Sequence, residues 1–300
     1  MNRKSARFRA VDVLLIAMMI LPLVAGMALK ILTTPASDGI EISGARIYFT
    51  IPMPVQNLPI TESQVNSWLV MISILGLCLY LVHGITVKPG SKRQLAAEWI
   101  VEKTNGLVRE NMGKRFMGFA PFVAGIMALS AFSSLMSLVG LRAPTADMNV
   151  VAGWAILCFA LITHYKLKGG VWPYVKGFFD PIPVFAPFNI IGELATPVSM
   201  SFRHYGNVLS GAVISTLIAY ALQNLSKMLL GWLPGVLGDI PFLQIGLPAV
   251  LSLYFDIFSG LMQAFIFAIL TMLYIANGFP EDLYQQRQER KARKRALHSA

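Results

Sequence analysis

The sequence predicts an all-α polytopic membrane protein, and three observations carry this prediction. Of the 300 residues, 55% are hydrophobic and only 13% are charged, whereas a soluble globular domain carries about 25% charged residues. The apolar residues gather into about six segments, each long enough to span about 30 Å of hydrocarbon as a helix. The basic residues also lie mainly at one set of segment ends.

The distribution of positive charge predicts the orientation of the chain. The net charge of +10 by itself would suit a protein that binds nucleic acid. Most Lys and Arg residues, however, fall in the amino-terminal stub, in two connections at about 88–115 and 166–176, and in the carboxy-terminal tail. The basic residues at the opposite ends are few: Lys30, Arg46, Arg142 and Lys227. This positive-inside pattern predicts a multi-pass membrane protein with a cytoplasmic carboxy terminus and no nucleic-acid partner.

The first apolar segment, about 11–32, is predicted to be an uncleaved anchor because its apolar core is long. A signal peptide is the alternative, since Thr34 and Ala36 are small residues near a plausible cleavage site. A weak alternation at 40–50 predicts a short hairpin. The chain thus divides into an anchor or signal-like segment at 1–32, an external loop at 33–66, a membrane domain at 67–278 and a basic cytoplasmic tail at 279–300.

Three ordinary spans are expected in the membrane domain, at about 67–87, 116–141 and 150–167. Asp147 or Thr145 is expected to cap the last of these helices.

The stretch 91–112 is charged but periodic, which predicts an amphipathic helix lying in the plane of the membrane. Ser91 and Gln94 fit a capping box at its start. A soluble loop helix is the alternative. The expected apolar face consists of Ala97, Ile100, Val101, Thr104, Val108 and Met112.

The last two segments, about 188–230 and 242–276, are longer than a membrane requires. A helix of some 33 residues is about 50 Å long, and it crosses about 30 Å of hydrocarbon only if it tilts by roughly 50°. Either these helices break at Pro197 and Pro248, or they form a long, steeply tilted hairpin. We favour the hairpin.

Arg203 lies inside the first of these long segments and marks a candidate functional site. A guanidinium stays protonated at any accessible pH, and at the bilayer centre it costs about 2.5–3.5 kcal/mol on insertion scales. An anionic partner or a hydrated path is therefore expected beside it. Helical spacing places it on a polar stripe with Ser199, Asn207, Ser210 and Gly211, with Glu193 towards the cytoplasmic end of roughly the same face.

A second polar stripe follows the last segment, and the two stripes are expected to face each other. Its members recur at helical spacing: Ser252, Asp256, Gly260 and Gln263.

Structural roles compete with ion translocation at several of these positions. Arg203 could form a static ion pair with Glu193 or Asp256 instead of taking part in an ion path. Asn207 and Gln263 are alternatively interhelical hydrogen-bonding residues.

His204, about 100° around the helix from Arg203, is expected to pack rather than carry protons. Asp147 is likewise expected to act as a cap rather than to conduct ions.

No catalytic site is expected in this chain, because its spans contain no HExxH, GxSxG or paired catalytic Asp motif. Cys78 and Cys158 lie in apolar runs, where a thiol behaves as a small hydrophobe. No CxxC or Cys/His cluster predicts a metal site, and no cofactor is expected.

Several motifs resemble subunit a of bacterial F-type ATP synthases, in the same order over about 60–278. The most specific is 197–207 (PVSMSFRHYGN). The others are 60–62 followed by Trp68, 144–149 (PTADMN), 187–193 (PFNIIGE), 263–267 (QAFIF) and 270–272.

The resemblance implies a stator subunit that contacts a rotating ring of c subunits, each with a membrane-buried carboxylate. Arg203 would meet that carboxylate and separate two half-channels for H⁺ or Na⁺. Asn207, Asp256 and Gln263 match positions around the external half-channel, and Glu193 matches the cytoplasmic one. The implied partners also include the peripheral-stalk b subunits and the rest of the F1Fo complex, within the lipid bilayer.

Two positions depart from the family pattern. Many members have Leu-Phe in place of His204 and Tyr205, and many carry a carboxylate at the position of Ala212. We infer that Asp256 supplies the missing acid from the facing helix. An ion-coupled secondary transporter is the competing function, but such folds usually show internal repeats, and none is evident.

Overall fold

The computed structural model describes residues 3–33, 44–54, 56–87, 91–180, 182–231, 243, 246–286 and 289. Within these residues, six helical stretches are long and apolar enough to cross a membrane, so the predicted all-α polytopic fold is confirmed. The main helices are α1 (Arg3–Thr33), α2 (Glu62–Val82), α3 (Lys92–Met112), α4 (Ala120–Leu135), α5 (Met148–Lys166), α6 (Val171–Gly177), α7 (Ala186–Leu230), α9 (Leu247–Ser252) and α10 (Gly260–Gly278).

A short antiparallel hairpin precedes α2, later in the chain than predicted. It pairs β1 (Ile47–Ile51) with β2 (Leu58–Thr61), and residues 40–43 of the predicted hairpin lie outside the described part of the chain. The expected boundary at 66–67 falls inside α2, because a complete capping box starts that helix earlier. The Thr61 hydroxyl accepts from the Gln64 N–H, and the Gln64 side chain accepts from the Thr61 N–H.

The predicted caps at the starts of α3 and α5 are both present, but the cap of α3 is not a complete capping box. The Ser91 hydroxyl accepts a hydrogen bond from the Gln94 N–H at 3.3 Å. The Gln94 side chain donates to the Thr86 carbonyl at 2.7 Å, so the predicted capping box is incomplete. Asp147 caps α5 as predicted, since its side chain accepts from the second N–H of the helix at 3.0 Å. Thr145 is buried instead.

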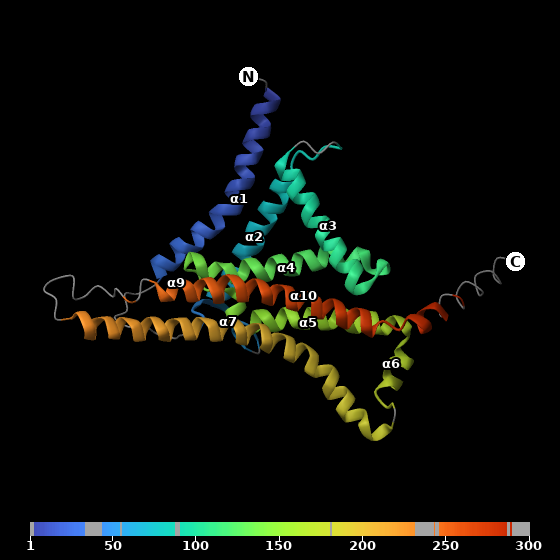
Figure 1. Ribbon diagram of the computed structural model, residues 1–300. Helices are drawn as coiled ribbons and strands as arrows, with labels where there is room; N and C mark the ends of the chain where they lie inside the picture. The colour runs from blue at the N-terminus through green and yellow to red at the C-terminus, as the bar shows by residue number, and fades with distance from the viewer. Residues whose placement is uncertain are drawn as a thin grey trace.

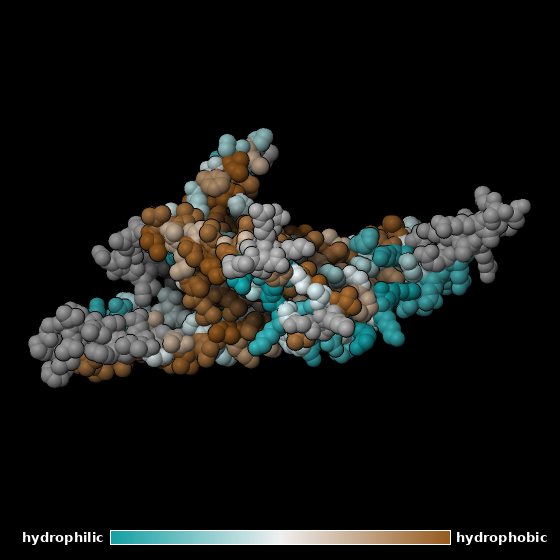
Figure 2. Space-filling view, turned by 90° about the horizontal axis from the view of Figure 1, so that it is seen from above, coloured by the Kyte–Doolittle hydropathy of each residue, from teal (hydrophilic) through white to brown (hydrophobic). Residues whose placement is uncertain are grey.

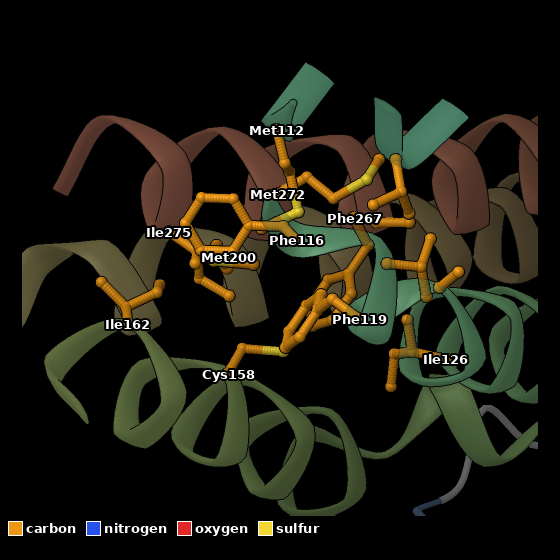
Figure 3. Close-up of a cluster of buried hydrophobic side chains, with 14 of the residues drawn as sticks. Met112, Phe116, Phe119, Ile126, Cys158, Ile162, Met200, Phe267, Met272 and Ile275 are labelled. Atoms are coloured by element: carbon orange, nitrogen blue, oxygen red, sulfur yellow. The ribbon is translucent and has the colours of Figure 1, made fainter. Parts of the chain in front are cut away.

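The main hydrophobic core lies where α4, α5 and α10 meet the end of α3 (Figure 3). Of the apolar face predicted for α3, only Val108 and Met112 enter this core, while Ile100 and Val101 are exposed. One residue of α7, Met200, also joins the core. The labelled side chains in Figure 3 are Met112, Phe116, Phe119, Ile126, Cys158, Ile162, Met200, Phe267, Met272 and Ile275.

The two long carboxy-terminal segments do not break at Pro197 or Pro248, the alternative that the sequence left open. Helix α7 is 45 residues long and is continuous through Pro197. Figure 1 shows it bending between its yellow and orange parts. A proline removes one backbone donor, which is a common cause of a kink. Pro248 lies in the first turn of α9, where proline is tolerated. The interruption in this segment is instead a π-helix, Leu253–Ser259, between α9 and α10.

The helices form two groups that cross at a wide angle. In Figure 1, α1 and α2 slope across the group formed by α4, α5, α10 and the orange part of α7. Helices α7 and α10 lie side by side in this second group, as in the long hairpin predicted from the sequence. Figure 2 shows hydrophilic surface gathered at the end of the molecule that carries the carboxy-terminal residues, with apolar surface over its middle.

Helix α1 packs closely on α2 through a glycine. A Cβ atom added at Gly76 would lie 2.9 Å from the backbone nitrogen of Met19 and 3.3 Å from the carbonyl oxygen of Leu15. Small residues allow this kind of backbone approach between membrane helices.

We therefore expect Gly76→Val to separate α1 from α2 and to destabilise the protein, because the backbone of α1 cannot yield as a side chain would. Overpacking of this kind costs about 1–3 kcal/mol. Thermal unfolding of the detergent-solubilised protein measures the effect. Gly153→Val is the matched control, since an added Cβ there has nothing within 4 Å; equal losses of stability in the two variants would contradict the packing argument.

Candidate functional site

Arg203 lies on an exposed face of α7. Its own side chain is exposed, and so is Phe202 beside it. The other polar members of the stripe, Ser199, Asn207 and Ser210, are exposed as well. A permanent cation thus lies on a long apolar surface that the described part of this chain leaves uncovered.

The acids proposed as static partners of Arg203 are engaged elsewhere. Glu193 accepts both of its close hydrogen bonds from Lys166 Nζ, at 2.8 and 2.7 Å. Asp256 accepts a hydrogen bond from the Ser252 hydroxyl. Among the residues that the structure describes, no ion pair joins Arg203 to a carboxylate. The static pairing considered from the sequence is therefore wrong.

A cavity of about 450 Å³ surrounds Glu193 at one end of the bundle. We call it the Glu193 cavity; Lys166, Tyr174 and Asn189 also line it, together with several glycines. The Tyr174 hydroxyl donates to Glu193 at 3.3 Å. Burial, and then the Glu193 charge, raise the pKa of Tyr174, so the phenol keeps its proton and remains a donor.

A second cavity, of about 410 Å³, lies further along α7. We call it the Asp256 cavity. The wall contributed by α7 includes Ala212 and Thr216, and Ser134 and Lys30 also line the space. Asp256 itself belongs to the π-helix, a rare element that occurs frequently at functional sites. Ala212 and Asp256 therefore share one cavity, as the substitution inferred from the sequence requires.

The part of the first polar stripe around Arg203 does not face the second stripe, which corrects the expectation from helical periodicity. Arg203 and Asn207 point outwards, while the opposite side of α7 carries Ala212. Gly211 packs on the other long segment, where an added Cβ would lie 2.9 Å from the Phe255 ring. The arginine and the acid of the partner helix therefore lie on different sides of α7.

His204 lies in the core, next in sequence to the outward-facing arginine. Its Nε2 atom is 3.2 Å from the Ser130 hydroxyl, and its ring makes edge contacts with Trp154 and Phe267 at centroid distances of 6.0 and 5.5 Å. These contacts are those of a packing residue. Gln263 is also buried, at 3% exposure, and Asp147 is occupied in capping α5.

Three lining residues were missed as site residues from the sequence. The position of Lys166 at the end of an apolar span marked it as a residue near the membrane surface. Its contact with Glu193, however, depends on tertiary structure. Lys30 and Ser134 likewise reach the Asp256 cavity only through helix packing. Within the described ranges, no group of three or more His, Cys, Asp or Glu side chains is arranged to hold a metal ion.

The sequence is similar to known proteins over most of its length. The sequence matches the family described as ATP synthase A chain over residues 64–276. It is 27% identical over 275 residues to "ATP synthase subunit a, sodium ion specific" of Propionigenium modestum, covering 81% of this chain and 88% of the relative. It is 33% identical over 216 residues to ATP synthase subunit a of Acidothermus cellulolyticus, covering 68% and 72% of the two chains. For the Bacillus pumilus subunit a the identity is 30% over 225 residues, with coverages of 69% and 89%. Because the family match extends over more than half of its length, the chain belongs to the ATP synthase A chain family and is a multi-pass membrane protein of the bacterial type.

Proposed function

We propose that this chain is the stator subunit of the membrane sector of an ATP synthase, and that Arg203 is the stationary counter-charge to a moving acid. One observation carries the proposal: an arginine lies on an uncovered apolar helix face, with no carboxylate partner among the described residues. The hydrocarbon core of a bilayer offers such a charge no compensating group. A carboxylate presented by a second protein at the same depth can, and a ring of c subunits presents one after another.

The two cavities suit the two half-channels. At about 1.5 Å per residue, Arg203 lies about 15 Å along α7 from Glu193. Ala212 lies at a similar distance from Arg203 towards the opposite end of the helix. Under the positive-inside rule, the Glu193 cavity opens towards the cytoplasm and the Asp256 cavity towards the outside. An ion would enter through one cavity and bind to the rotor acid. It would be released through the other cavity before that acid pairs with Arg203.

The energy for rotation comes from the charge that each ion carries across the membrane. Moving one charge through 100 mV releases about 2.3 kcal/mol. Arg203 prevents direct leakage between the half-channels, since an ion bound to the rotor acid is displaced when the guanidinium approaches. Asn207, one turn further along the same exposed stripe, and Gln263 are proposed to support the external path. The chain itself needs no cofactor for this role.

The competing function is an ion-coupled transporter without a rotor. Gentle detergent extraction followed by affinity purification of the tagged chain separates the two. A stator subunit is expected to co-purify with a c ring, the b subunits and F1, whereas a transporter is expected as a monomer or homodimer. Purification of the chain without any rotor subunit would contradict the proposed function.

Replacing Arg203 is expected to uncouple ion flow from synthesis. In vesicles containing the reconstituted complex, we expect Arg203→Ala to lower ATP synthesis from an imposed gradient by about 100-fold or more, the usual loss when a preorganised electrostatic group is removed. Arg203→Lys is expected to be impaired too, because an ammonium lacks the planar fork of a guanidinium. Lys227→Ala, which removes an exposed cation from the far end of α7, is the control; normal synthesis without leakage in Arg203→Ala would refute the role.

Asp256 is expected to be the acid of the external half-channel. Asp256→Asn should lower ATP-driven ion pumping by about 100-fold or more, the range of a lost proton-transfer group. The double variant Asp256→Asn, Ala212→Asp should regain part of the activity, because both positions line one cavity. Asp147→Asn is the matched control, since asparagine also caps helices well. Near-normal pumping by Asp256→Asn would exclude this assignment.

A further inference from the structure

Glu193, the acid assigned above to the cytoplasmic half-channel, is occupied by a cation of this chain. We propose that Lys166 is a positioning residue that competes with the transported cation for the Glu193 carboxylate and so lowers the affinity of the Glu193 cavity for that ion. The inference rests on the proposed function, because it assigns to one of the two half-channels the residue that sets its ion affinity.

The Lys166 ammonium engages both carboxylate oxygens of Glu193. Its Nζ atom lies 2.8 Å from Oε1 and 2.7 Å from Oε2, and the Tyr174 hydroxyl donates to Oε1 at 3.3 Å. The two charged side chains are partly buried, with exposed fractions of 26% for Lys166 and 18% for Glu193. A cation that binds this carboxylate needs at least one of the same two oxygens. It therefore meets the ammonium directly.

Helices α5 and α10 together place the ammonium beside α7. Lys166 belongs to the last turn of α5, where a cation also interacts favourably with the negative end of the helix dipole. Its aliphatic stem passes Gly278, the last residue of α10. A Cβ atom added at Gly278 would lie 2.8 Å from the Lys166 Cε atom and 3.0 Å from its Cγ atom. A glycine at the end of α10 thus leaves the space through which the lysine reaches Glu193.

The ion pair lines a cavity instead of being enclosed in the core. The Glu193 cavity has a volume of about 450 Å³, and one water molecule takes about 30 Å³ of liquid volume. Pro280 and Leu283, which follow α10, form another part of the lining. A hydrated ion therefore fits beside the carboxylate without any helix having to move.

A purely structural role accounts less well for the pair. Helices α5 and α7 also meet further along the bundle, where the Trp154 and His204 rings are in contact at a centroid distance of 6.0 Å. Desolvation of two charges offsets much of their attraction in a partly buried site, so an ion pair adds little stability to helices that already pack.

The acid faces one cation among the residues that are described around this cavity. The ionisable side chains in that part of the lining are Lys166, Tyr174 and Glu193. Tyr174 keeps its proton, as described above, and acts as a donor. The occupancy of Glu193 by an incoming ion is therefore set by competition with Lys166.

This competition has a measurable consequence. A cation in contact with a carboxylate lowers the affinity of that carboxylate for a proton by about tenfold or more, and the partial exposure of this pair favours the lower end of the range. The same charge opposes the binding of Na⁺. Removing the charge of Lys166 should therefore let ions bind from the cytoplasmic side at lower concentrations. During synthesis, when ions leave through this cavity, the same change should slow their release.

The test uses inverted membrane vesicles that contain the whole complex. ATP-driven ion pumping is measured against the pH on the cytoplasmic side in one series and against Na⁺ in another. For the transported ion, Lys166→Gln is expected to lower the apparent KM by about tenfold. If that ion is H⁺, half-maximal pumping moves upwards by about one pH unit.

Two further variants separate the charge of the lysine from its packing. Lys166→Met keeps a long stem beside Gly278, so it should give the same shift, and it supplies the measurement if the glutamine variant does not assemble. Lys166→Arg should stay near the wild-type KM, because a guanidinium keeps the charge and binds two carboxylate oxygens at once.

Lys176→Gln is the matched control. Lys176 is an exposed lysine of α6 that is not among the described residues around the cavity, so no change in KM is expected. An unchanged or higher KM in the Gln and Met variants of Lys166 would overturn the inference, and so would a shift of equal size in Lys166→Arg or Lys176→Gln. A loss of yield or of maximal rate with KM in place would assign Lys166 a structural role and would also overturn it.

Failure of this inference is distinguishable from failure of the proposed function. The stator role depends on the Arg203 variants and on co-purification with the c ring. Neither of those results changes if the KM does not respond to the charge at Lys166.

Discussion

The organisation of this protein depends on one unfavourable placement, a guanidinium on an apolar helix surface. Arg203 is exposed on α7, and Glu193 and Asp256 are engaged with Lys166 and Ser252. Because those acids are satisfied locally, the arginine stays available to a group from outside the chain. The surrounding apolar face allows that group to approach within a membrane. The two cavities lie beside α7 rather than on this face.

The two cavities differ in their internal electrostatics. In the Glu193 cavity an acid is paired directly with a lysine and accepts a further bond from Tyr174. In the Asp256 cavity the acid is held by a serine of its own segment and shares the lining with two cations. Direct pairing lowers the cost of an ionised carboxylate in a partly buried site, whereas separation leaves the acid accessible to ions. In the function that we propose, the two cavities would therefore suit different steps of one ion path.

Local patterns predicted much of this structure, and tertiary packing explains the remainder. The position of Arg203 within an apolar helix follows from composition, and the Asp147 cap follows from a short-range hydrogen bond. The Thr61 capping box was also readable in the sequence but was overlooked, which displaced the start of α2. The π-helix around Asp256 was not predictable from a pattern that assumes 3.6 residues per turn. Contacts between distant residues, such as Lys166 with Glu193 and Lys30 with Gly140, depend on helix crossings that periodicity does not specify.

The buried histidine next to the arginine has a mechanical consequence. Neighbouring residues of an α-helix differ by about 100° in direction, so the ring of His204, enclosed between Trp154 and Phe267, sets the roll of α7 about its own axis. A helix free to rotate about its axis would move the guanidinium away from the exposed face, where the proposed function requires it. The packing of the His204 ring between two aromatic side chains therefore determines the direction in which the Arg203 side chain points.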